Sequence, residues 1–96
     1  GFSFHNMSAF SWRPSNEPDA ANNAFQDWLI EAATHPTYAD TRRDLLNWEQ
    51  APNARYCHPR EEHLLPLLVC AGIAQAPAQV LFDDAILSKR GLAFGW

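Results

Sequence analysis

The sequence predicts an α/β fold with about three helices and three strands. Two stretches place apolar residues at helical spacing, a third is almost wholly apolar over residues 64–73, and three short stretches are rich in aromatic and aliphatic residues. The order strand, helix, helix, helix, strand, strand leaves few strands to cover three helices. We therefore expect a partial layer, which pairs with more protein through a missing upstream half, a partner subunit or a homo-oligomer.

The first predicted element is a strand over residues 1–7. Phe2 and Phe4 alternate with polar residues there, a period of two that delivers His5 at the end of the strand. Residues 8–18 include Pro14, Ser15, Asn16 and Pro18, which predicts a loop.

Two amphipathic helices follow. Asp19 is a suitable N-cap for a helix over residues 20–34, which ends before His35-Pro36. Residues 37–50 predict a second helix, because Leu45 and Trp48 share a broad apolar face and charged residues point largely outward.

The second half predicts one buried helix and a hairpin. Residues 64–73 are apolar and are expected to be buried in a helix that reaches residue 74. Residues 78–87 and 91–96 are strand candidates on either side of residues 88–90, so they predict a hairpin that joins a larger sheet.

Composition limits the classes of function. A hydrophobic fraction of 47% with 19% charged residues predicts a globular chain, and a net charge of −4 gives no basic surface for nucleic acid or an anionic membrane. No apolar run reaches the roughly 18 residues of a membrane span. We expect Cys57 to be reduced and Cys70 to be a small, reduced core residue, which predicts a cytoplasmic protein.

The most informative stretch is residues 58–68, which puts two histidines and two glutamates next to an apolar helix. Pro66 predicts a short tight turn followed by the main helix, because proline cannot donate to a regular helix. In a continuous helix, His58 and His63 would diverge by roughly 140°, so they would not chelate one metal together.

This stretch resembles the motif near the carboxyl end of class III extradiol ring-cleavage dioxygenases, in the branch of DOPA 4,5-dioxygenase-like proteins. Residues 1–7 resemble the second signature of that family, a strand ending in His-Asn, and residues 91–96 are similar to how these proteins end. The resemblance spans essentially all of residues 1–96. It implies the carboxyl-terminal portion of a larger catalytic domain, whose other metal-binding histidines lie upstream.

The resemblance also implies roles for particular residues. His63 matches a ligand to Fe(II), with Zn(II) as an alternative occupant of the same site. His5 matches a histidine that acts as acid and base, or is an extra metal contact when no substrate is bound. Asn6 would orient substrate or cap a turn. The structural alternatives are a helix-start histidine that donates to a carboxylate for His63 and a strand-end histidine that only hydrogen-bonds for His5.

His58 and Glu62 are weaker candidates. Four residues apart on a helix, they would share a face, and either would fix the ring of His63 or contact substrate. The alternative for Glu61 and Glu62 is a pair of solvated carboxylates at a helix start. No glycine-rich phosphate loop and no His-Glu-x-x-His zinc helix is present in the sequence.

The function implied by the resemblance is the ring opening of catechol-type substrates with molecular oxygen at a non-haem iron. The competing hypothesis is a catalytically incomplete chain that serves as a binding or assembly module.

Overall fold

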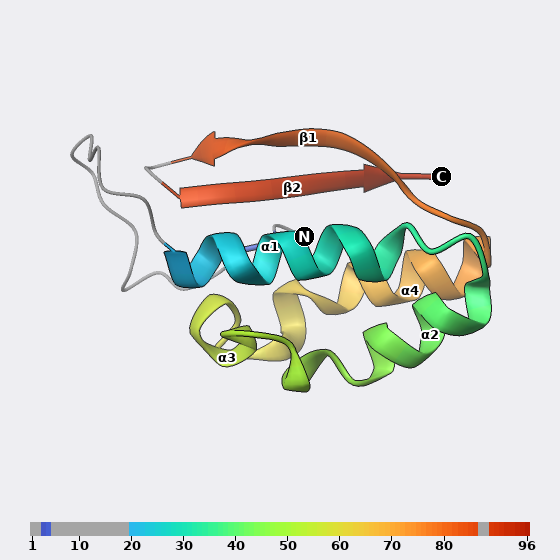
Figure 1. The fold of residues 1–96 in the computed structure, drawn as a ribbon, viewed down its shortest axis with the longest axis horizontal. Helices are drawn as coiled ribbons and strands as arrows, with labels where there is room; N and C mark the ends of the chain where they lie inside the picture. The colour runs from blue at the N-terminus through green and yellow to red at the C-terminus, as the bar shows by residue number, and fades with distance from the viewer. Residues whose placement is uncertain (1–2, 5–19, 87–88) are drawn as a thin grey trace.

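The computed structural model describes residues 3–4, 20–86 and 89–96 and has a mixed α/β fold, which confirms the predicted class (Figure 1). In this part of the chain four α-helices and two short 3-10 helices accompany an antiparallel pair of strands. The helices are α1 (Ala20–Ala33), α2 (Tyr38–Leu46), η2 (Trp48–Gln50), α3 (Ala54–Cys57), η3 (Glu61–His63) and α4 (Leu65–Ala74), and the strands are β1 (Gln79–Ile86) and β2 (Lys89–Gly95).

Helix α1 is the centre of the fold and agrees to within one residue with its prediction. It contacts β2 on one side and α2 and α3 on the other, so it lies between the hairpin and these helices (Figure 1). Its apolar stripe, with Phe25, Leu29 and Ala32, is fully buried in a core to which α2, α3 and β2 also contribute. This is the burial that its apolar spacing predicts.

The single helix predicted for residues 37–50 is wrong. The chain leaves the α-helix at Asn47, whose side-chain Nδ2 donates to the carbonyl of Arg43 at 2.8 Å, and η2 then buries Trp48. Asparagine favours such a helix end because its amide bonds the local backbone.

The short helix α3 is an element that the sequence did not predict. It follows Asn53, which adopts a left-handed conformation with φ of 60°, and the Asn53 side chain donates to the carbonyl of Ala21 at 3.1 Å. Asparagine tolerates this conformation better than most residues. The single turn buries Ala54 and Cys57 against α1.

The prediction of a tight turn followed by a helix is confirmed, because η3 leads into α4 with Pro66 in its first turn. The expected burial of residues 64–73 is wrong. Leu64 and Ala71 are buried, but most of α4 is half-buried or exposed, and Cys70 is exposed rather than a core residue. The described elements leave Leu65, Val69 and Ile73 of α4 exposed. Both thiols are free, with Cys57 buried.

The predicted hairpin is confirmed, although β2 begins two residues earlier than expected. The strands pair from Gln79 with Gly95 to Ile86 with Lys89, and Leu81 forms a bulge between Val80 and Phe82. Leu92 on β2 is buried, whereas Val80, Leu81 and Phe82 of β1 are exposed.

Of the strand predicted for residues 1–7, Ser3 and Phe4 are described, and neither is in a strand. The other residues of that stretch, the predicted loop over residues 8–18 and the predicted cap Asp19 lie outside the described residues. Within residues 3–4, 20–86 and 89–96, no helix is both long and apolar enough to cross a bilayer.

Candidate functional site

An open pocket of about 160 Å³ lies between the start of α4 and the strand β2. Its wall combines one imidazole and one thiol with mostly apolar side chains. The residues that line it are Ser3, His63, Leu64, Pro66, Leu67, Cys70, Leu92, Ala93, Phe94 and Trp96. Three separate parts of the chain, near residues 3, 66 and 94, therefore meet at this pocket.

His63 is an exposed residue of this wall, at the end of η3. The turn holds its shape through the Leu64 amide, which donates to the carbonyl of Glu61 at 2.9 Å, and Leu64 itself is buried. The backbone next to His63 is therefore anchored where this residue lines the pocket.

The two glutamates before His63 lie in surface ion pairs. Glu62 accepts from Arg60 at 3.0 Å, and Glu61 accepts from Arg55 at 3.3 Å. A hydrogen bond from its own backbone amide, assisted by Arg55, holds the pKa of the Glu61 carboxyl below its usual value. Neither glutamate lines the pocket.

His58 is fully buried and belongs to the core. Its ring lies 5.5 Å from the ring of Phe25 and 6.4 Å from that of Trp48, centroid to centroid. Its Nε2 is 2.6 Å from the carbonyl oxygen of Ser3, and because a carbonyl only accepts, Nε2 carries the proton and donates. The structure thus places His58 and His63 in different surroundings, one in the core and one at the pocket.

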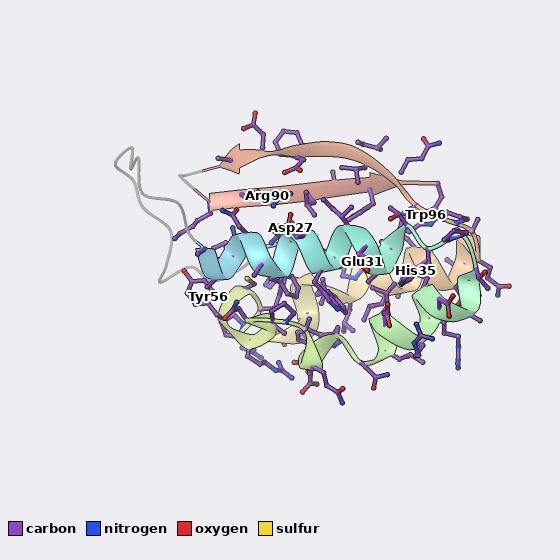
Figure 2. The ribbon with its side chains drawn as sticks, in the orientation of Figure 1. Asp27, Glu31, His35, Tyr56, Arg90 and Trp96 are labelled. Carbon is purple, nitrogen blue, oxygen red and sulfur yellow. The ribbon has the colours of Figure 1, made fainter. Side chains whose placement is uncertain are left out.

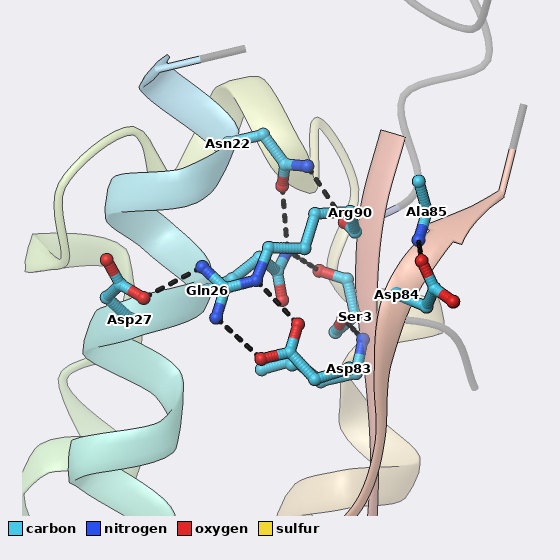
Figure 3. A network of polar contacts seen from close by, with 9 residues as sticks. Ser3, Asn22, Gln26, Asp27, Asp83, Asp84, Ala85 and Arg90 are labelled. Atoms are coloured by element: carbon cyan, nitrogen blue, oxygen red, sulfur yellow. Dashed lines mark hydrogen bonds and ion pairs between the residues drawn. The ribbon is translucent and has the colours of Figure 1, made fainter. Parts of the chain in front are cut away.

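Ser3 is the centre of a buried polar cluster (Figure 3). Its carbonyl also accepts from Gln26 Nε2 at 2.9 Å, and its Oγ accepts from the Leu92 amide at 2.6 Å. Gln26 Nε2 donates in addition to Asn22 Oδ1 at 2.8 Å. The segment that directly precedes His5 is therefore fixed to α1, to His58 and to β2.

The cluster continues outward through an ion-pair network around Arg90 (Figure 3). Asn22 Nδ2 donates to the carbonyl of Arg90 at 2.8 Å. The Arg90 guanidinium donates to both oxygens of Asp83, at 2.7 and 2.8 Å, and to Asp27 at 2.7 Å. These hydrogen bonds lower the pKa of the Asp83 carboxyl and raise that of Arg90. Helix α1 is thereby tied to the hairpin.

His5 and Asn6, the other candidates from the sequence, lie outside the described residues. His35 is described and lies near the end of α1 (Figure 2). Its Nε2 donates to Asp44 at 2.6 Å, which lowers the pKa of that carboxyl, and it does not line the pocket. Its role is to join the end of α1 to α2.

A complete metal centre is not formed by the residues that the structure describes. No group of three His, Cys, Asp or Glu side chains close enough to hold a metal occurs among them. His63 and Cys70 are the metal-ligating types on the pocket wall. At the pocket the described residues therefore offer one imidazole and one thiol, fewer than the three protein ligands of typical open catalytic sites.

Sequence reasoning missed the residues that position the site. Asn22 and Gln26 are fully buried polar side chains, and Ser3 is nearly so. The signal was present, because Asn22 and Gln26 lie four residues apart on the same side of α1 as Leu29. Polar residues on the apolar face of a helix indicate a buried hydrogen-bonded cluster.

Comparison with known proteins gives one informative similarity. No family model and no solved structure matches the chain. Over 75 residues the chain is 36% identical to a 4,5-DOPA dioxygenase extradiol-like protein of Schizosaccharomyces pombe, an alignment that covers 76% of this chain and 24% of the relative. The chain thus spans about a quarter of the length of the curated relative that it matches. The similarity supports the resemblance seen in the motifs, as a partial and distant match.

Proposed function

We propose that this chain is the carboxyl-terminal portion of an extradiol dioxygenase that opens the ring of catechol-type substrates with molecular oxygen. The observation that carries the proposal is the 36% identity over 75 residues to a protein named as extradiol dioxygenase-like. The position of His63 on a pocket wall shared with Ser3, two residues before His5, supports it.

In this proposal His63 is one ligand of an Fe(II) ion, for which Zn(II) is an alternative occupant. Imidazole suits both ions. Iron bound there would bring the catechol and oxygen together. The remaining protein ligands would come from polypeptide outside the described residues, since these offer no set of three. His5 would hold and return a proton, with an unperturbed pKa of about 6.5, and Asn6 would orient the substrate.

The described residues of the pocket would serve to exclude water and to position an aromatic ring. Leu67, Phe94 and Trp96 form an apolar wall beside His63. The Trp96 indole N–H donates to the carbonyl of Ala76 at 2.9 Å, which fixes one edge of this wall. Apolar and aromatic walls with a few polar groups are typical of sites for small organic ligands.

The test is a His63→Ala substitution in the complete protein that contains this chain. We expect the iron content per polypeptide, measured by elemental analysis after purification, to fall to background, because a ligand is removed from a small set. His35→Ala is the matched control, since His35 pairs with Asp44 away from the pocket wall, and this variant should keep its iron. Full iron content in folded His63→Ala protein would show that His63 is not an iron ligand.

A second candidate function is a binding or assembly module without catalysis. Among the described residues no three candidate ligands come together, an arrangement compatible with this candidate. We expect the purified 96-residue chain with added iron(II) and a catechol to show no oxygen uptake above a protein-free control. Oxygen uptake that needs the chain, and that its His63→Ala variant does not show, would contradict the hypothesis of a non-catalytic module. It would favour the hypothesis of an enzyme.

A further inference from the structure

Helix α4 carries apolar surface that the described structure leaves uncovered. All ten of its residues are apolar or small, and Ala71 is the one that is fully buried. Leu65, Val69 and Ile73 follow one another every four residues and are 42%, 59% and 79% exposed. These three residues, called the α4 stripe below, form one line along the helix.

The other sides of α4 have neighbours. Leu68 and Ala71 line a groove shared with Leu45 and Leu46 of α2, and Leu67 and Cys70 line the pocket shared with β2. The α4 stripe lies between these two sides and faces away from both. A helix that is apolar all round is typical of the interior of a protein, so its open side indicates a missing neighbour.

Strand β1 gives a second, independent indication. Its side chains from Gln79 to Ala85 are all exposed, and Val80, Leu81 and Phe82 are among them. In the described part of the chain β1 pairs only with β2. A two-stranded sheet with apolar residues exposed on the outer strand is marginal in water and typically belongs to a larger sheet.

We propose that the α4 stripe is a docking surface for polypeptide of the same protein that lies outside these 96 residues. The chain corresponds to 24% of its relative, so that relative has ample further polypeptide to supply the neighbour.

A second copy of this chain is a less suitable neighbour for the α4 stripe. Ten helical residues span about 15 Å, and three side chains are few beside the roughly 20–30 residues per partner of a stable interface. A segment on the same chain needs less contact area, because its tether raises the effective concentration.

This inference rests on the proposed function only in placing the chain within a longer protein, and its test involves neither metal nor turnover. The experiment compares the labelling rates of two engineered cysteines in the complete protein, in a Cys70→Ser background. Ile73→Cys places the probe on the α4 stripe. Glu31→Cys is the matched control on the exposed surface of α1 (Figure 2). Each variant reacts with a maleimide, and the labelled peptide is quantified by mass spectrometry.

We expect the Ile73→Cys thiol of the complete protein to react more than about tenfold slower than the Glu31→Cys thiol, because covered sites react only after local opening. In the 96-residue chain alone the two rates should be comparable. Val69→Cys is the second probe if Ile73→Cys does not fold, with the same expected protection.

Comparable rates in the complete protein would overturn the proposal. So would protection in the 96-residue chain alone that disappears on dilution, because it would assign the surface to a second copy. An intact mass of 10.8 kDa for the native protein would also overturn it, since no further polypeptide would exist.

Discussion

A few buried polar side chains decide how the segment before His5 is held. The carbonyl of Ser3 accepts from both His58 and Gln26, and its hydroxyl accepts from the Leu92 amide. Each of these groups is withdrawn from water, so leaving one unpaired would be unfavourable. Because Ser3 also lines the pocket with His63, the cluster sets the geometry between two parts of the chain that are sixty residues apart.

Substitutions of His58 and Glu62 should differ in their effect on stability, because His58 lies in the core and Glu62 lies on the surface. His58→Ala removes a buried ring and a donor to Ser3, so we expect a loss of about 3 kcal/mol in the free energy of unfolding. Glu62→Ala removes a surface ion pair with Arg60 and should change stability by less than about 0.5 kcal/mol. Urea unfolding followed by tryptophan fluorescence measures both. Equal effects of the two substitutions would contradict these placements.

Among the elements, α4 contains a residue that is suboptimal for a helix. Gly72 lies in its interior, and a Cβ built there meets no heavy atom within 4 Å. In the 96-residue chain Gly72→Ala should therefore raise the free energy of unfolding by about 0.5–1 kcal/mol, through helix propensity alone.

The reverse change at the neighbouring position is the control for Gly72→Ala. Ala71 is buried, so Ala71→Gly should lower stability by about 1 kcal/mol or more, from lost propensity and a lost buried methyl group. Thermal unfolding of the two variants, followed by circular dichroism, should give shifts of opposite sign. A destabilised Gly72→Ala chain would mean that the open space beside Gly72 is filled.

The elements also show what the sequence could predict. Helix α1 and the hairpin were predicted because their apolar spacing matches the faces that they bury, and Pro66 predicted the turn before α4. The break at Asn47 was missed although its signal is local, because the side chain bonds the carbonyl of Arg43 four residues earlier. The turn of α3 was missed because Asn53 bonds the carbonyl of Ala21, a partner far away in the sequence that local pattern does not encode.

The burial of α4 and the surroundings of the two histidines depend on neighbouring parts of the chain, which the local sequence does not specify. The expected burial of α4 follows from its composition, but the described residues supply a neighbour on only some of its sides. The motif drew attention to His63, which lies at the pocket. The motif ranked His58 below His63 but did not predict that His58 is buried, because its burial depends on Phe25 and Trp48, which lie outside the motif.

The layers of the molecule are joined by Arg90, which makes the attachment of the hairpin dependent on pH. Its guanidinium connects Asp83 on β1 with Asp27 on α1. Hydrogen bonding to Arg90 holds the pKa of Asp83 below its unfolded value of about 3.9, while Arg90 stays charged throughout. Stability from this pair is therefore fully present above about pH 4 and is lost as the pH falls through the lower pKa of the folded state.

Replacing Arg90 by glutamine should remove that contribution while keeping the backbone carbonyl that accepts from Asn22. At pH 7 we expect Arg90→Gln to lower the free energy of unfolding by about 1 kcal/mol, at the upper end for exposed pairs because the contact is bidentate and shared with a second carboxylate. Between pH 4 and pH 2 the difference from the parent chain should shrink, since protonated Asp83 no longer attracts the guanidinium.

Arg60→Gln is the control, because it breaks an ion pair with Glu62 in which both side chains are largely exposed. Its free energy of unfolding should equal that of the parent chain at every pH. Urea titrations at several pH values measure these differences. A gap between Arg90→Gln and the parent that stays constant down to pH 2 would mean that Arg90 stabilises the junction through packing of its stem rather than through the ion pair.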